Sequence, residues 1–161
     1  MILKNSTNVS RKETTKIEMN ASNVNPVCRR HIVFGWWCLA VFMSLGVALE
    51  CLHALEVSEY LTNETRRMMW RLAHAHGTLL GLLNIAFALS ADRINQAKSS
   101  LASRLLLIGT VLLPGGFFAG GVTTYASDPG PGVWLVPIGA VAALAAVVIT
   151  ALAVGKRSSD S

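Results

Sequence analysis

Four long apolar runs constrain what this chain of 161 residues can fold into. They cover residues 32–55, 72–91, 105–122 and 133–154, and are 24, 20, 18 and 22 residues long. A helix needs about 20 apolar residues to cross a hydrocarbon core of about 30 Å, and backbone groups in lipid must be hydrogen-bonded within the protein. The runs do not show the alternation that membrane strands require. They predict an all-α fold, an integral membrane four-helix transmembrane bundle.

The composition supports a membrane protein and excludes a nucleic-acid binder. Hydrophobic residues make up 52% of the chain and charged residues 14%. The 14 Lys and Arg exceed the 9 Asp and Glu, but all of these cations lie outside the apolar runs. They are not gathered with aromatic residues on a folded surface, as nucleic-acid binding requires. The expected partners are the lipid bilayer and either other membrane subunits or further copies of this chain.

The regions outside the spans are short and polar. Residues 1–30 contain no aromatic residue, and 11 of the 30 are Asn, Ser or Thr, so this stretch is expected to be a flexible, disordered tail. Residues 31–155 are predicted to form the transmembrane domain, and residues 156–161 a C-terminal tail. The three cysteines are too few for a disulfide framework.

The distribution of Lys and Arg predicts the orientation in the cell membrane. Eleven lie in the N-terminal tail, the second loop and the C-terminus, against three in the first loop and none in the third. The positive-inside rule therefore places both termini in the cytoplasm. Tryptophans near the ends of the runs are expected at the interfaces; these are Trp36, Trp37, Trp70 and Trp134.

Ionisable groups within the spans are costly in lipid, so each is a candidate for function. The first span ends, and the second begins, on the outer face. Their polar groups are thus predicted to share the outer leaflet of one hairpin; they are Glu50, His53, Arg71, His74 and His76. Arg71 is a predicted charge partner. Asp128, beyond the third span, is expected on the same side. His31, at the inner end of the first span, is expected to be a solvated flank.

Small and polar residues at helical spacing predict close helix packing. Gly77 and Gly81 form one small-xxx-small pair in the second span, and Gly116 and Gly120 form another in the third. Gly46 lies on the polar face of the first span. Asn84 falls within the same arc as Gly77 and Gly81, where it is expected to hydrogen-bond across the seam.

The outer-leaflet residues are candidates for binding a metal or haem. Glu50 and His53 have E-x-x-H spacing on one helix face, and His74 could add a third ligand. Alternatively, His53 and His74 could hold a haem between two helices. His74 and His76 are about 200° apart and are not expected to face the same seam. A di-iron centre is not expected, because it needs two such motifs.

Several functions remain open from the sequence. The leading hypothesis is redox-linked or metal-linked membrane chemistry at the outer site. Alternatively, the charges simply neutralise one another, or a Glu and His pair takes part in proton or quinone chemistry. A further alternative is a non-catalytic structural or assembly subunit whose glycine faces meet other helices. A transporter is least favoured, because no second polar layer is evident in the membrane. No nucleophilic triad, phosphate loop or dinucleotide fingerprint occurs, so whether the chain is an enzyme stays undecided.

Overall fold

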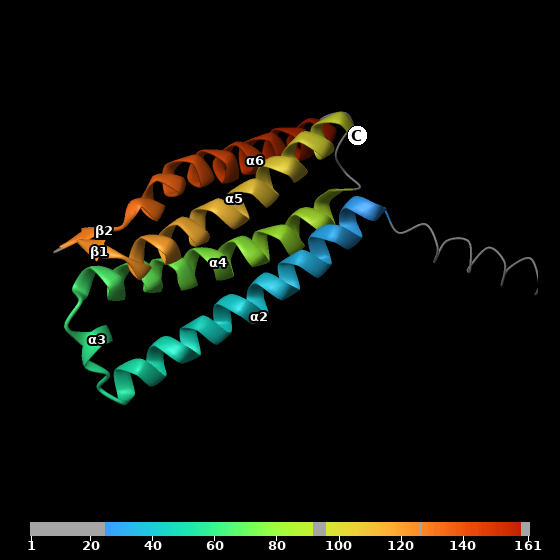
Figure 1. The fold of residues 1–161 in the computed structure, drawn as a ribbon. Helices are drawn as coiled ribbons and strands as arrows, with labels where there is room; N and C mark the ends of the chain where they lie inside the picture. Colours follow the sequence, from blue (N-terminus) through green and yellow to red (C-terminus); the bar gives the residue numbers. More distant parts are fainter. Residues whose placement is uncertain (1–24, 92–95, 126, 159–161) are drawn as a thin grey trace, which may run out of the picture.

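A computed structural model describes residues 25–91, 96–125 and 127–158 (Figure 1). Its long helices are α2 (Pro26–Ala54), α4 (Glu64–Ser90), α5 (Gln96–Val122) and α6 (Leu135–Ser158). Its short elements are α3 (Ser58–Leu61), β1 (Thr124–Tyr125), β2 (Asp128–Pro129) and the 3-10 helix η2 (Pro131–Trp134). Four helical segments in the described part of the chain are long and apolar enough to span a membrane. The predicted four-helix membrane fold is confirmed.

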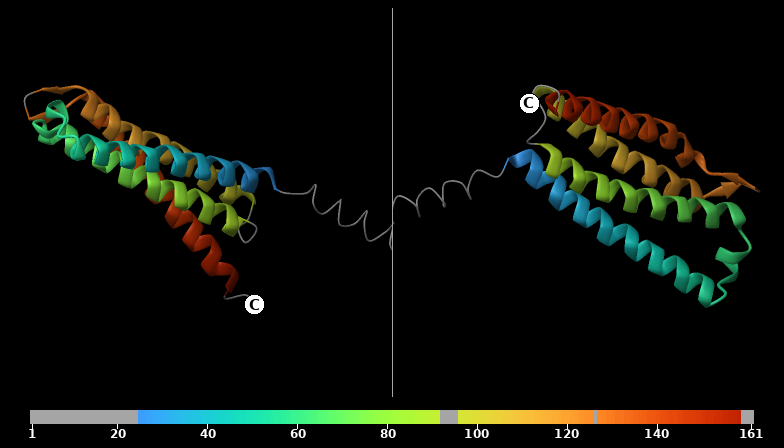
Figure 2. Two further views of the ribbon diagram at one scale, coloured as in Figure 1. Left: turned by 90° about the horizontal axis from the view of Figure 1, so that it is seen from below. Right: turned by 180° about the vertical axis from the view of Figure 1, so that it is seen from behind.

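The long helices pack in the order in which they follow along the chain. α2 packs on α4, α4 on α5, and α5 on α6, so that α2 and α6 form the two edges of the array (Figures 1 and 2). The short elements α3, β1 and β2 gather at one end, called here the α3 end. The start of α2 and the end of α6 both lie at the other end, at opposite edges of the array (Figure 1). An even number of spans thus brings both ends of the described chain to the same side.

Three of the long helices, α2, α4 and α5, begin earlier than the apolar runs predict, and the first two begin at a side-chain cap. α2 begins at Pro26 rather than Ile32, because the side chain of Asn25 caps it by accepting a hydrogen bond from the backbone N–H of Val27 at 3.0 Å. α4 begins at Glu64, where Asn63 accepts from the backbone N–H of Arg66 at 2.9 Å. Residues 26–30, expected in the flexible tail, are therefore helical. The rest of that tail, residues 1–24, lies outside the described residues, as do residues 159–161 of the C-terminal tail.

Glycines allow α2 and α4 to pack closely along the seam between them. A Cβ atom at Gly35 would lie 2.7 Å from the carbonyl oxygen of Gly81, so the two backbones approach each other directly. Farther along the seam, Gly77 makes room for the ring of Phe42, and Gly46 makes room for His74. Small residues allow such close approach, which favours dispersion contacts in a medium without a hydrophobic driving force.

The hydrophobic core lies where the central helix α5 packs against α4 and α6. Its buried residues Ala102, Leu106 and Leu113 pack with α4 and α6. Glycines again allow the close approach: Gly109 meets Ala143 on α6, and Gly116 meets η2 and the start of α6. Gly120 contacts the same connection, near Val133. The glycine faces of α4 and α5 are thus covered by helices of this chain.

We expect Gly35→Ala to destabilise the fold, because the new methyl group would collide with a backbone carbonyl that cannot rotate away. Overpacking of this kind costs about 1–3 kcal/mol. The loss would appear as a lower midpoint of thermal unfolding in detergent. Gly115→Ala is the matched control, because a Cβ there meets nothing within 4 Å. Equal stability of the two variants would show that the α2–α4 seam is looser than described.

Candidate functional site

Three of the predicted polar groups, Glu50, Arg71 and His74, border an open cleft between α2 and α4 at the α3 end. The cleft has a volume of about 580 Å³ and is lined by Met43, Gly46, Val47, Leu49, Glu50, Cys51, Ala54, Arg71 and His74. Glu50 and Arg71 are exposed, whereas His74 is half-buried. The antiparallel packing of α2 and α4 therefore brings a carboxylate, a guanidinium and an imidazole to one cleft with an otherwise largely apolar wall.

His74 is held in one orientation by a backbone carbonyl of the neighbouring helix. Its Nδ1 lies 2.6 Å from the carbonyl oxygen of Phe42. A carbonyl oxygen can only accept a hydrogen bond, so Nδ1 carries a proton; in the neutral ring, Nε2 then carries the lone pair. Gly46 lies beside the ring, where a Cβ atom would collide with it. The imidazole in the cleft is thereby oriented by its Nδ1, and Nε2 is the ring nitrogen that could accept a proton or bind a metal.

His76 turns to the opposite side of α4, as the 200° separation predicts. Its Nδ1 donates to the carbonyl oxygen of Leu72 in its own helix at 2.8 Å. Its ring packs against Phe117 of α5, with centroids 5.0 Å apart. His76 and His74 therefore face different neighbours, and the structure does not bring them together.

The remaining predicted residues do not complete a metal site. His53 is exposed in the last turn of α2 and is not among the residues that line the cleft. Asp128 is exposed in β2, paired with Tyr125 across the small hairpin. Within residues 25–91, 96–125 and 127–158, no three His, Cys, Asp or Glu side chains are grouped so that they could hold a metal ion. The E-x-x-H pair and His74 thus do not form a three-ligand cluster.

At the other end of the bundle, the structure overturns the expectation for His31. Its side chain is 0% exposed rather than solvated. Nδ1 lies 2.7 Å from Oδ1 of Asn84 on α4, and Nε2 lies 2.8 Å from Oγ of Ser103 on α5. The ring also packs on Phe87, with centroids 4.6 Å apart. His31 is therefore buried between α2, α4 and α5, and its imidazole joins the three helices.

The hydrogen bonds around His31 continue in both directions. Arg30 donates to Ser103 Oγ at 2.6 Å. Asn84 donates through Nδ2 to Thr110 Oγ1 at 2.8 Å and to a carbonyl of its own helix. Thr110 in turn donates to a carbonyl of α5 at 2.7 Å. A second polar layer therefore exists, contrary to the sequence-based expectation, and it links three helices.

The donors and acceptors of this layer fit a single arrangement of protons. Nδ2 of Asn84 faces two acceptors, so its Oδ1 must accept from Nδ1–H of His31. Nε2 of His31 then accepts from the hydroxyl of Ser103, which itself accepts from Arg30. The chain runs from a guanidinium to a backbone carbonyl with every link satisfied. Such satisfaction is what allows polar side chains to be buried in a membrane helix array.

One sequence signal could have revealed this layer. Ser103 and Thr110 are seven residues apart, which places them on one face of a helix. Asn84 was recognised as a seam residue, but serine and threonine are common in membrane helices and His31 lies at the edge of an apolar run. The missing information was which face of α5 meets α2 and α4.

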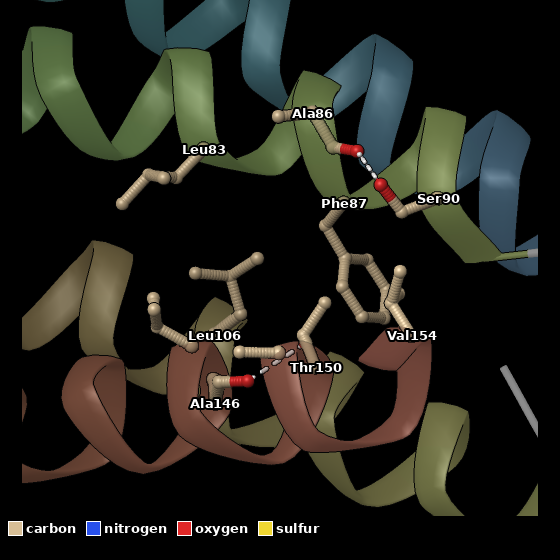
Figure 3. Close-up of a pocket in the computed structure, with 10 residues that line it drawn as sticks. Leu83, Ala86, Phe87, Ser90, Leu106, Ala146, Thr150 and Val154 are labelled. Carbon is tan, nitrogen blue, oxygen red and sulfur yellow. Dashed lines mark hydrogen bonds between the residues drawn. The ribbon is translucent and has the colours of Figure 1, made fainter. Parts of the chain in front are cut away.

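A second cavity, of about 290 Å³, lies between α4, α5 and α6 (Figure 3). Leu83, Phe87, Leu106 and Val154 are among the side chains that line it. The hydroxyls of Ser90 and Thr150 in its wall donate to carbonyls of their own helices. This cavity therefore offers apolar surface and little chemistry.

Comparison with known proteins adds no assignment. The chain matches no protein-family model, and neither the curated proteins nor the solved structures contain a significant match. Any function must therefore be argued from the two polar layers.

We expect Asn84→Leu to lower the free energy of unfolding by about 1–3 kcal/mol, because Nδ1 of His31 loses its acceptor and Thr110 loses one of its two bonds inside the bundle. Ser90→Ala is the matched control, since that hydroxyl bonds within its own helix. A double-mutant cycle with His31→Phe, read by unfolding in detergent, should show a coupling of about 1 kcal/mol. Additive effects would contradict a direct bond between the two side chains.

Proposed function

We propose that this chain is a small multi-pass protein of the cell membrane that binds haem through His74 for redox-linked chemistry. The observation that carries the proposal is the hydrogen bond from Nδ1 of His74 to the carbonyl of Phe42. Histidines that ligate metals typically donate their other ring N–H to such an acceptor, which fixes the tautomer and orients the ring. Nε2 is then the atom that would bind iron.

The cleft favours haem over a small metal ion. A structural transition metal such as zinc needs several protein ligands, and no three-residue cluster occurs among the described residues. Haem iron can be held by a single histidine. The volume of about 580 Å³ falls within the usual size of cofactor sites. Met43, Val47 and Leu49 offer apolar surface, and Arg71 offers a cation for a propionate group. Haem, when bound, would supply one-electron chemistry.

The alternative hypothesis, an assembly subunit of a membrane complex, has less support than the cofactor site. That hypothesis needs glycine faces available to other proteins. Gly77 and Gly81 meet α2, and Gly116 and Gly120 meet the connection before α6, so this chain covers all four. The transporter alternative gains a second polar layer, but the groups of that layer bond one another rather than line a path. These contacts favour the cofactor site over both alternatives.

If the proposal is right, protein purified in mild detergent from cells supplied with haem precursor will show a Soret band with roughly one haem per chain. His74→Ala is expected to abolish the band while the protein still inserts and folds. His74→Gly with added imidazole should restore it, because the free ligand can occupy the space of the lost ring.

The controls are the two other histidines near the α3 end. His53→Ala should retain the band, since His53 does not line the cleft, and His76→Ala should retain it because that ring faces α5. A colourless wild-type protein, or equal loss in all three variants, would refute haem binding at His74.

The proposed orientation, with both termini in the cytoplasm, rests on the excess of Lys and Arg on that side. Cys51 is exposed at the α3 end, and Cys28 and Cys38 are buried. A membrane-impermeant maleimide should therefore label Cys51 in intact cells. In a cysteine-free background, Ser100→Cys, exposed near the start of α5, should react only after the membrane is permeabilised. The reverse pattern would invert the topology.

A further inference from the structure

A groove runs along one face of α2 at its N-terminal end. It has a volume of about 630 Å³ and is lined by Pro26, Arg29, Arg30, Val33, Phe34 and Trp37. These positions are separated by three or four residues in the pattern of a single helix stripe. The two arginines occupy the end of the stripe nearest the helix start, and the apolar and aromatic residues follow deeper in the span.

The cationic end of the groove can bind an anion. Arg29 and Arg30 are both exposed. Arg30 gives one N–H to Ser103, and its guanidinium has further donors for a second acceptor. Among the described residues that line the groove there is no carboxylate to neutralise the arginines. Guanidinium groups bind phosphate oxygens in a bidentate manner, which makes a phosphate group the matching ligand.

The apolar end indicates what carries the phosphate. The stripe continues from Arg30 to Trp37 for about 10 Å along the helix, at about 1.5 Å per residue. Val33 is 47% exposed and Trp37 is 68% exposed, so both are available to a neighbouring molecule. A free phosphate ion would leave this surface unused, whereas acyl chains would cover it. Tryptophan is also typical of the level at which lipid headgroups meet acyl chains.

We propose that this groove is a binding site for an anionic phospholipid, with the phosphodiester held by Arg29 and Arg30 and an acyl chain along Val33, Phe34 and Trp37. The site is independent of the cleft at His74 and lies at the opposite end of α2. Arg30 also donates to Ser103, so a headgroup bound to Arg30 orients the guanidinium that begins the buried hydrogen-bond chain. Lipid binding therefore stabilises the packing of α2 on α4 and α5.

The test is the thermal unfolding of the full chain in detergent, titrated with phosphatidylglycerol or phosphatidylcholine. Phosphatidylglycerol should raise the midpoint by several degrees, and phosphatidylcholine should raise it much less. Arg29→Gln, which leaves the buried chain intact, should weaken the apparent affinity about fivefold. Arg71→Gln, at the other end of the bundle, is the matched control and should bind as the wild type does.

A second variant separates binding from structure. Ser103→Ala should lower the midpoint without lipid but leave the ratio of phosphatidylglycerol to phosphatidylcholine affinity unchanged, because both arginines remain. Equal stabilisation by the two lipids would overturn the proposal, since the groove would then bind only acyl chains. Equal stabilisation by inorganic phosphate would overturn it in favour of a simple anion site.

Contact with the acyl chain can be read from Trp37 directly. In a variant with Trp36→Phe, Trp70→Phe and Trp134→Phe, Trp37 is the remaining tryptophan. Phosphatidylglycerol with brominated acyl chains should quench its fluorescence at lower concentration than brominated phosphatidylcholine does. Introducing Arg29→Gln should remove that difference; its persistence would show that the arginines do not select the lipid.

Discussion

The imidazole of His31 holds the first helix of this array against two others. Both of its ring nitrogens are bonded, one to Asn84 on α4 and one to Ser103 on α5. In lipid, a polar group without such partners costs free energy, so the bonds fix the rotation and the depth of α2. The glycine seam then follows, because a rotated α2 would no longer place Gly35 against the backbone of Gly81.

The two ends of the α2–α4 pair use histidine in opposite ways. His31 has both nitrogens satisfied inside the protein, and it therefore serves structure. His74 has one nitrogen bonded to a carbonyl and lines an open cleft, which is why we propose chemistry at its other nitrogen. The difference comes from α5. At the first end its Ser103 bonds His31, whereas at the α3 end its Phe117 packs against His76, and His74 bonds α2 instead.

The sequence predicted the fold because span length and hydropathy depend on each helix alone. It also placed Gly46 on the polar face of the first span, and Gly77, Gly81 and Asn84 on one face of the second. It did not predict His31, because burial there depends on Ser103, which is more than seventy residues away in the chain. The helix starts were also misplaced, since the caps at Asn25 and Asn63 lie outside the apolar runs. Contacts between helices distant in sequence were the missing information.

The order in which the helices pack also bears on how the protein is made. Each span rests mainly on the one synthesised just before it, so α2 and α4 can meet as a hairpin while the ribosome is still extending the chain. His31 and Asn84 can already bond each other in that hairpin, which satisfies one ring nitrogen in lipid. Ser103 arrives with the third span and closes the junction. Biogenesis can thus proceed from the first span to the last with the imidazole gaining one partner from the second span and the other from the third.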